Sequence, residues 1–484
     1  MTLRRSIAAV LTVSLTPLLC ASCAETGEDA WQPPRIVRIE GAKGAYSVSP
    51  MYGTLFGKAI EKAGQGEEPF KALEATTYVL IRPGELVDLM EGGPFPYAAG
   101  DGTTLSLKAE RDRVILAGRK VTLELDDEEA WTWLAEAPEA DLAALRMIHV
   151  GDVAPAETEG EDEGEPSVEY RRQALARLGK ANPRVGALLG DVSAVQPVLE
   201  TLDPPWLSLG DAALTEEDRD LLADESHLHT LMMKAQAEGG LAFLSRLSHV
   251  QTLFLTEWEG PDDDAAPPRL PTMPSLRTLI VFGSKMRDLG PVGEQPRLRE
   301  LALVSAEDLA DLGRLAEMPG LRSLSLQGCV KVTDLSALSG LKRLRWLALP
   351  PKTTQAQFAT VCTEHPDLEI LTAVGCEKVT DLAPAAGLKR LRVLCVTTVA
   401  PLAPLARAES LELLGVHTPK EQPEVEQRKT DQALVRVLEA NPDLAVVRVS
   451  PMCLGSGWIL LLAPMTAAAW LLARRRFRTA GRHA

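Results

Sequence analysis

Residues 321–335 read LRSLSLQGCVKVTDL, and this stretch decides the fold of the chain. Leucine stands at positions 321, 324 and 326, and the last two share the two-residue spacing of one β-strand face. Apolar residues recur with the same spacing at Leu276, Leu279, Val281; Leu298, Leu301, Leu303; Leu344, Leu347, Leu349; Leu368, Leu371, Ala373; Leu391, Leu394, Val396; and Leu411, Leu414, Val416. From residue 276 to residue 391 five steps cover 115 residues, or 23 each. Such a period predicts a stack of short repeated units.

An aspartate-leucine pair recurs in phase with the leucines. Asp288, Asp311, Asp334 and Asp381 each precede a leucine, at separations of 23, 23 and 47 residues. An aspartate carboxylate accepts the free amide hydrogens of a first helical turn. Each aspartate is therefore expected to be the N-cap of a short helix on the outer side of its unit.

Two units carry a more specific pattern. Residues 321–335 and 368–382 both place Gly-Cys, at Gly328-Cys329 and Gly375-Cys376, shortly before Val-Thr-Asp-Leu. In this they resemble the cysteine-containing class of leucine-rich repeat. The resemblance implies a horseshoe whose parallel strands line a concave face, with short helices or 3₁₀ turns outside and a role in protein recognition. Other units carry Ser284, Ala306, Lys352 and Val399 at the cysteine position, and less regular turns are expected there.

Fainter copies extend the repeat in both directions. Leu145, Ile148 and Val150 begin the series, and Leu444, Val447 and Val449 end it. Asn182-Pro183 leads into the weak copy at Val185 and Leu188, and Asn441-Pro442 leads into the one at Leu444. Both share this lead-in with His365-Pro366 of a clear unit, which indicates a common origin.

The predicted fold class is α/β. It is a leucine-rich-repeat solenoid, a curved parallel sheet with short outer helices, over residues 141–450 and clearest over 250–416. Residues 25–140 do not repeat, and their alternating apolar runs predict a small β-rich N-terminal domain.

The first 24 residues have the order of a secretory signal peptide. Arg4-Arg5 precedes an apolar run over residues 7–19, and small residues follow up to Ala24. Cleavage after Ala24 is the preferred interpretation. The stretch from Cys20 to Cys23 also resembles a bacterial lipoprotein signal, which would place a lipid on Cys23, although Cys20 stands where leucine is usual.

The C-terminal end predicts a membrane anchor. Residues 453–473 carry no charge, and as a helix they would extend about 31 Å, enough for one transmembrane span. The tail 474–484 contains five arginines, which favours a cytoplasmic position for it and places the body of the chain outside the cytoplasm. The end also loosely resembles bacterial C-terminal sorting signals. A GPI signal fits less well, because the basic tail follows the apolar run.

Charge argues against nucleic acid as a partner. The formal net charge is -16, and seven of the 51 basic residues lie in the two terminal segments, which contain no acidic residue. The region between them is therefore strongly acidic and repels a phosphate backbone.

Known catalytic patterns are missing from the sequence. No histidine precedes His149, and there is no phosphate loop or nucleophile elbow. Cys329 and Cys376 lie two repeats apart, about 10 Å at strand spacing, which is too far for a disulfide. His227 and His229 fit an exposed strand face better than a metal pair. We therefore expect no enzyme, catalytic residue, cofactor or metal.

One set of residues is a candidate partner-binding surface. The position after the first leucine of each unit holds Arg277, Arg299, Arg322, Arg345, Glu369, Arg392 and Glu412. Stacking of the strands would align them at about 4.8 Å per step. Trp346 is an exposed aromatic candidate among them, and arginine and tryptophan are favoured in binding hot spots. An acidic protein partner is expected; the alternative, that the arginines only solubilise the sheet, stays open.

Three functions follow from this pattern. The first is a membrane-anchored extracytoplasmic protein of a bacterial-type envelope that binds a protein through the concave face of the solenoid. The second is a structural envelope protein without a dedicated ligand. The third is an enzyme whose activity resides in residues 25–140.

Overall fold

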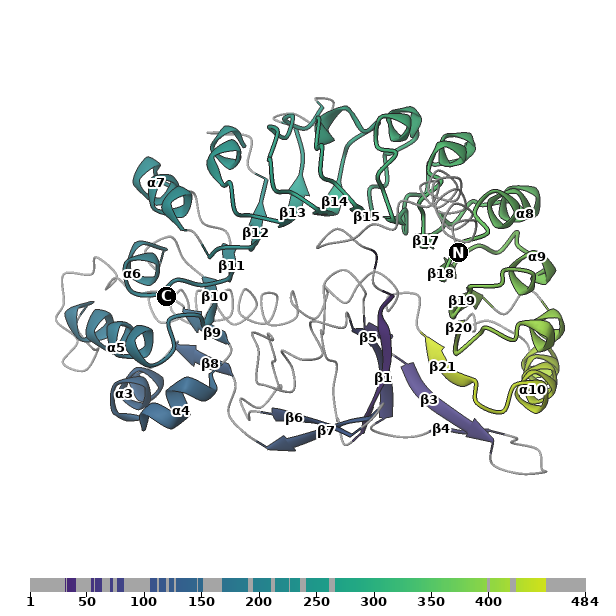
Figure 1. Ribbon diagram of the computed structural model, residues 1–484, viewed down its shortest axis with the longest axis horizontal. Coiled ribbons are helices and arrows are strands. Elements are labelled where there is room, and N and C mark those ends of the chain that lie inside the picture. The colour runs from purple at the N-terminus through teal and green to yellow at the C-terminus, as the bar shows by residue number, and fades with distance from the viewer. Residues whose placement is uncertain are drawn as a thin grey trace, which may run out of the picture.

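A curved sheet with outer helices forms the body of the protein (Figure 1). The computed structural model describes residues 31, 33–40, 54–55, 57–62, 70–72, 76–81, 105–110, 113–118, 122–125, 128–145, 147–150, 168–189, 195–209, 214–225, 227–235, 241–260, 266–397, 401–417 and 424–449. Within these residues, sixteen strands pair into one sheet and five into a second. Figure 1 shows the larger sheet bent into a horseshoe, with its strands along the inner face.

The large sheet follows the order of the chain. Neighbouring strands from β8 to β21 are parallel, one strand from each unit. The strands are β8 (Thr122–Leu125), β9 (Met147–Val150), β10 (Gly186–Leu189), β11 (Trp206–Leu209), β12 (Thr230–Lys234), β13 (Thr252–Trp258), β14 (Thr278–Ser284), β15 (Glu300–Val304), β16 (Ser323–Ser325), β17 (Trp346–Ala348), β18 (Ile370–Ala373), β19 (Val393–Thr397), β20 (Leu413–His417) and β21 (Ala445–Val449). This arrangement confirms the predicted solenoid.

Helices cover the outside of the horseshoe, α-helices mainly near its ends and 3₁₀ helices in the middle (Figure 1). They are α3 (Glu128–Glu136), α4 (Glu139–Ala144), α5 (Val168–Ala181), α6 (Val195–Thr201), α7 (Glu216–Asp224), α8 (Gln355–Glu364), α9 (Ala383–Ala386) and α10 (Glu424–Ala440), with 3₁₀ helices η2 (Ala242–Arg246), η3 (Gly290–Val292), η4 (Gly313–Glu317), η5 (Ser336–Gly340) and η6 (Ala403–Arg407). Neighbouring strands on the inner side lie closer together than neighbouring outer segments do. This difference in spacing bends the stack into a curve.

The repeated leucines fill the space between the sheet and the outer helices. Leu301, Leu324 and Leu347 stand side by side in the parallel register, and all three are fully buried. Burying one such side chain stabilises the fold by about 1.5–3 kcal/mol, so this row supplies a large part of the stability. In β10, the side chains of Ala187 and Leu189 point into the core between the sheet and the outer helices. Leu188, which the sequence pattern placed in the core, is on the opposite face of the strand.

The N-terminal region is built of strands, and it meets both ends of the horseshoe. Its own five-stranded sheet has the order β2-β5-β1-β7-β6. The strands are β1 (Arg35–Glu40), β2 (Thr54–Leu55), β5 (Thr76–Ile81), β6 (Leu105–Glu110) and β7 (Arg113–Gly118), while β3 (Gly57–Lys62) and β4 (Phe70–Ala72) belong to the large sheet. Strand β3 pairs antiparallel with β21, where Ile60 lies beside Val446. Strand β8 forms the other edge of the large sheet, so this sheet begins before the expected domain boundary at residue 141.

Each repeated aspartate stands one residue earlier than expected. The N-caps of the outer helices are the leucines that follow the aspartates, such as Leu289 and Leu382. The aspartate side chain nevertheless accepts a hydrogen bond from the first helical amide, because it reaches two residues ahead. The four bonds are Gly290 to Asp288 at 2.6 Å, Gly313 to Asp311 at 2.7 Å, Ser336 to Asp334 at 2.9 Å and Ala383 to Asp381 at 2.8 Å.

Replacing Asp381 by alanine should cost about 1 kcal/mol of folding stability, as other lost helix-capping bonds do. The amide of Ala383 would lose its side-chain acceptor. Urea unfolding measures the loss. Asp381→Asn is the matched control, since it keeps an oxygen at the same place and should lose only a few tenths of a kcal/mol. Equal losses in the two variants would show that the negative charge matters and the acceptor does not.

The cysteine position of the repeat lies near the C-terminal end of the strand, and a cysteine or serine side chain there donates a hydrogen bond to a backbone carbonyl of the preceding unit. Cys329 donates its thiol hydrogen to the carbonyl of Leu303 at 3.4 Å, and Cys376 to that of Pro350 at 3.3 Å. Burial raises the pKa of both thiols to about 12, so they stay protonated. Ser284 makes the same kind of bond to Trp258, at 2.8 Å. The turn after β14 therefore keeps the regular contact, against the expectation from its missing cysteine.

The shared Asn-Pro or His-Pro lead-in has a structural role. Asn182 donates from its amide nitrogen to the carbonyl of Leu145 at 2.7 Å, and Asn441 donates to that of Leu405 at 3.3 Å. Each asparagine thereby ties its unit to the preceding one. His365 occupies the same place and is buried. Burial, together with the charge of Lys342, lowers the pKa of His365.

A pH dependence follows from the lowered pKa of His365. The unfolded chain, with a histidine pKa near 6.5, binds the proton more readily than the folded one. The contribution of His365 to stability is therefore present above pH 6.5 and is lost as the pH falls below that value. Thermal unfolding between pH 7.5 and 5 should show a steeper decline for the wild type than for His365→Asn. Parallel declines would mean that His365 does not carry the effect.

Candidate partner-binding surface

The predicted arginines form a ladder along one edge of the large sheet, the edge made by the N-terminal ends of its strands. Each one stands just before its strand, and its backbone amide donates to the residue one unit earlier. The bonds run from Arg299 to Arg277 at 2.8 Å, Arg322 to Arg299 at 2.7 Å, Arg345 to Arg322 at 2.8 Å, Glu369 to Arg345 at 2.7 Å, Arg392 to Glu369 at 2.8 Å and Glu412 to Arg392 at 2.8 Å. The backbones of all the candidate arginines thus lie on one continuous edge.

The side chains on this ladder are less exposed than the sequence suggested. Arg322 is only 6% exposed. Arg345 lies 3.5 Å from Asp367 and 3.9 Å from Glu369. Arg392 binds Glu412 with two nitrogens, at 2.6 and 2.9 Å, and this carboxylate raises the pKa of the Arg392 guanidinium. Trp346, expected to be exposed, is half-buried against apolar neighbours.

Exposed cations stand beside the ladder, in the turns before β15 and β17. Arg297, Lys342 and Arg343 are exposed there, next to the half-buried Arg299 and Arg345. We define the basic rim as Arg297, Arg299, Arg322, Lys342, Arg343 and Arg345, which come from three consecutive units. The sequence held a signal for the exposed members, because basic residues stand directly before the first leucine of two of these units.

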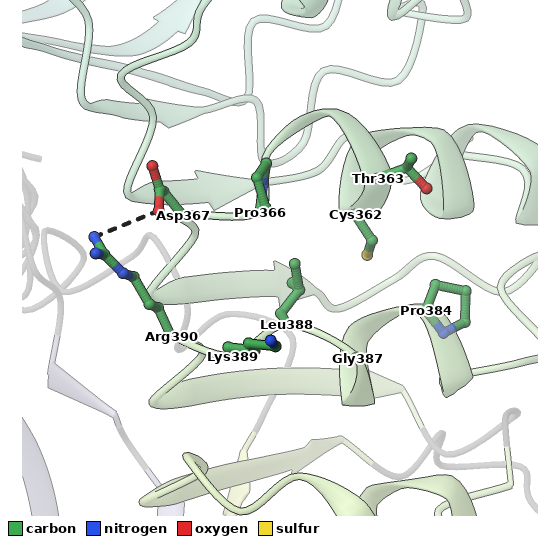
Figure 2. A pocket seen from close by; sticks show the side chains of 9 residues that line it. All are labelled: Cys362, Thr363, Pro366, Asp367, Pro384, Gly387, Leu388, Lys389 and Arg390. Carbon is green, nitrogen blue, oxygen red and sulfur yellow. Dashed lines mark ion pairs between the residues drawn. The ribbon is translucent and has the colours of Figure 1, made fainter. Parts of the chain in front are cut away.

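A pocket lies beside the same edge, between α8 and α9 (Figure 2). It measures about 530 Å³ and is lined by Cys362, Thr363, Pro366, Asp367, Pro384, Gly387, Leu388, Lys389 and Arg390. Figure 2 shows Arg390 directed at Asp367, and the two lie 3.4 Å apart. Asp367 also pairs with Arg345, so it links this pocket to the basic rim.

The concave face of the sheet is apolar towards the C-terminal end. Ile370, Val393, Cys395 and Leu413 project from neighbouring strands and are buried. They belong to a cluster separate from the solenoid core, and Trp31, Ile36 and Trp346 pack against it. The N-terminal region therefore already contacts part of the concave face that the sequence assigned to a partner.

A group of titratable side chains lies near the first units. His227 contacts Asp203 through Nδ1, and its Nε2 is 3.5 Å from Arg184. Burial and the adjacent Asp203 raise the pKa of Glu225 to about 7, so this carboxyl changes charge in the neutral range. His229 instead lies 3.5 Å from the carbonyl of His249. The two histidines thus contact different groups.

The terminal segments lie outside the described residues. These are the signal peptide 1–24 with Cys23, the span 453–473 and the tail 474–484. Among the helices that the structure describes, none has the length and apolarity needed to cross a bilayer.

The repeat, the parallel register and the outer helices together define the class: this is a leucine-rich-repeat solenoid. No protein-family model and no curated protein sequence matches the chain. Among solved structures, an internalin of Listeria monocytogenes is 16% identical over 62% of this chain and 91% of its own, with a TM-score of 0.32. The mouse RP105/MD-1 complex contains a chain 16% identical over 57% of this chain and 52% of its own, with a TM-score of 0.38. A leucine-rich-repeat protein of Leptospira interrogans is 13% identical over 67% of this chain and 99% of its own, with a TM-score of 0.23. All three scores lie below 0.5, and the class therefore rests on the chain's own repeat.

Proposed function

We propose that the chain is a recognition protein, held at a bacterial-type envelope membrane, that binds an acidic protein along the basic rim. One observation carries this proposal: six basic residues from three consecutive units meet on one edge of a chain whose net charge is -16. The sequences of residues 1–24 and 453–484 support export and anchoring. An acidic surface would be attracted to the rim and repelled by most of the remaining molecule.

The rim suits a protein surface better than a small anion. Its cations stand on rigid turns at the repeat spacing of the sheet, about 4.8 Å per unit. Arg297 and Arg343 lie two units apart, so together they face an extended patch. The pocket beside Asp367 adds a depression at the end of the rim, where Lys389 and Arg390 are exposed.

Charge reversal of the two exposed arginines tests the proposal. We expect Arg297→Glu/Arg343→Glu to capture at least tenfold less of the acidic partner from envelope extract than the wild type. The pair avoids Arg322, whose burial would confuse folding with binding. Captured proteins are quantified by mass spectrometry at two salt concentrations, because screening should weaken the wild-type interaction.

Lys180→Glu/Lys378→Glu is the matched control, since both lysines are exposed and lie off the rim. It changes the net charge by the same amount and should capture the partner as the wild type does. Equal loss in both double variants would indicate an effect of overall charge. Capture by the rim variant at the wild-type level would reject the rim as the binding surface.

A further inference from the structure

The apolar cluster on the concave face is unusual for a surface that faces away from the core. The side chains of Ile370, Val393 and Leu413 alternate with the inward leucines of their strands, so they point to the hollow of the horseshoe. Each is at most 3% exposed. Side chains on this side of the sheet are so deeply buried only because other residues cover them, and without that cover the contiguous apolar face would be a binding surface.

Part of the cover comes from the start of the described chain. Trp31 and Ile36 pack against the cluster, and Pro34 between them is buried. Arg392 donates to the carbonyl oxygen of Pro34 at 2.9 Å while its other nitrogens hold Glu412. The Arg392 guanidinium, which Glu412 holds in place, thus binds a backbone carbonyl that lies 358 positions earlier in the chain. This combination of apolar anchors and a backbone contact is how extended peptides are recognised.

We propose that the concave surface formed by Trp346, Ile370, Val393, Cys395 and Leu413 is a peptide-binding site, occupied in cis by Trp31 and residues 33–36. In trans it accepts an extended peptide with two bulky apolar side chains spaced like Trp31 and Ile36. Residues 35 and 36 begin β1, and the cluster that the segment covers is separate from the continuous core of the solenoid, so the segment can leave together with the five-stranded sheet while that core stays intact. Local opening therefore costs far less than unfolding, and a partner peptide competes for the opened site. This site is separate from the basic rim, and either can fail without the other.

Cys395 reports on the opening. It lies in the concave cluster, whereas Cys329, Cys362 and Cys376 lie in the core between sheet and helices. Iodoacetamide alkylates a cysteine when the thiolate sulfur attacks its methylene carbon, a sulfur–carbon bond forms, iodide leaves and the thiol proton passes to solvent. Reaction at Cys395 requires the concave face to be open, while reaction at the other three requires the solenoid to open.

The test compares alkylation rates at each cysteine in the full-length protein by mass spectrometry. We expect Trp31→Ala/Ile36→Ala to react at least tenfold faster at Cys395, with no change at Cys329, Cys362 or Cys376. Trp133→Ala/Leu221→Ala is the matched control; both residues are partly buried against the outer side of the core. It should leave the Cys395 rate at the wild-type value. Arg392→Lys, which keeps the charge but not the fork, should raise the Cys395 rate by a smaller factor.

A synthetic peptide of residues 30–40 completes the test. It should bind the Trp31→Ala/Ile36→Ala protein and bind the wild type at least tenfold more weakly, and the peptide with both side chains replaced should not bind. An unchanged Cys395 rate, or equal acceleration at all four cysteines, would overturn the proposal. A wild-type dimer whose Cys395 rate rises on dilution would assign the covering segment to a second copy and overturn the cis assignment.

Discussion

Replacing Gly328 by alanine is expected to lower the free energy of unfolding by about 3 kcal/mol, from a left-handed backbone and a steric clash. Gly328 has a φ of +78°, where a side chain is strained. A Cβ atom there would lie 3.0 Å from the backbone nitrogen of Ser305 and 3.1 Å from its Cα. Because these are backbone atoms of the adjacent unit, neither can move without disturbing the strand pairing. Urea unfolding, followed by circular dichroism, measures the loss.

Gly340→Ala is the matched control for this substitution. Gly340 ends η5, later in the same unit, and a Cβ atom there would meet nothing within 4 Å. Its φ is not positive, so alanine should change the stability by no more than about 1 kcal/mol, in the stabilising direction. Similar losses at Gly328 and Gly340 would contradict the assignment of a steric and conformational requirement to Gly328.

The second large effect is expected at Gly415, in β20. A Cβ atom at this position would lie 2.6 Å from Sγ of Cys395 and 3.3 Å from its Cβ. The two residues are register partners on adjacent strands, so neither strand can withdraw. Gly415→Ala should therefore cost about 2 kcal/mol, as overpacked sites do. Equilibrium unfolding gives the value.

A double-mutant cycle identifies the cause of that loss. Cys395→Ala alone removes a buried thiol and should cost about 1 kcal/mol. In the double variant the alanine methyl at position 415 occupies the space that the sulfur vacates. The double variant should therefore be at least about 1 kcal/mol more stable than the sum of the single losses implies. Strict additivity would show that the two side chains do not share this space.

The solenoid was predictable because its signal is local and repeated. Leu324 and its equivalents are buried for the same reason in every unit, so each copy reinforced the assignment of the others. The N-cap assignment of the aspartates is wrong by one position, because the outer helices begin one residue later than that assignment assumes. Their chemistry was nevertheless correct, since Asp381 still accepts a hydrogen bond from the first helical amide.

The burial of the candidate site was not predicted, although a signal existed. Residues 278–282 read TLIVF, and Ile280 stands between two inward residues, Leu279 and Val281, which indicates a strand buried on both faces. The row of arginines instead favours an open concave face, with Trp346 among its exposed residues. The burial of Arg322 has no local signal of this kind. The pairing of Ile60 with Val446 likewise depends on contacts between remote segments, which periodicity does not reveal.

The antiparallel pair of β3 with β21 has a consequence for how the protein is made. Its partners are separated by about 390 residues, so the first strand leaves the ribosome long before the second exists. At synthesis rates of 5–20 residues per second, the interval is on the order of 20–80 s. During that time the unpaired edge of β3 must be kept from associating with other chains. The exposed edge of β3 is thus covered only when the last unit is complete. Production of the protein should therefore depend on factors that shield nascent chains.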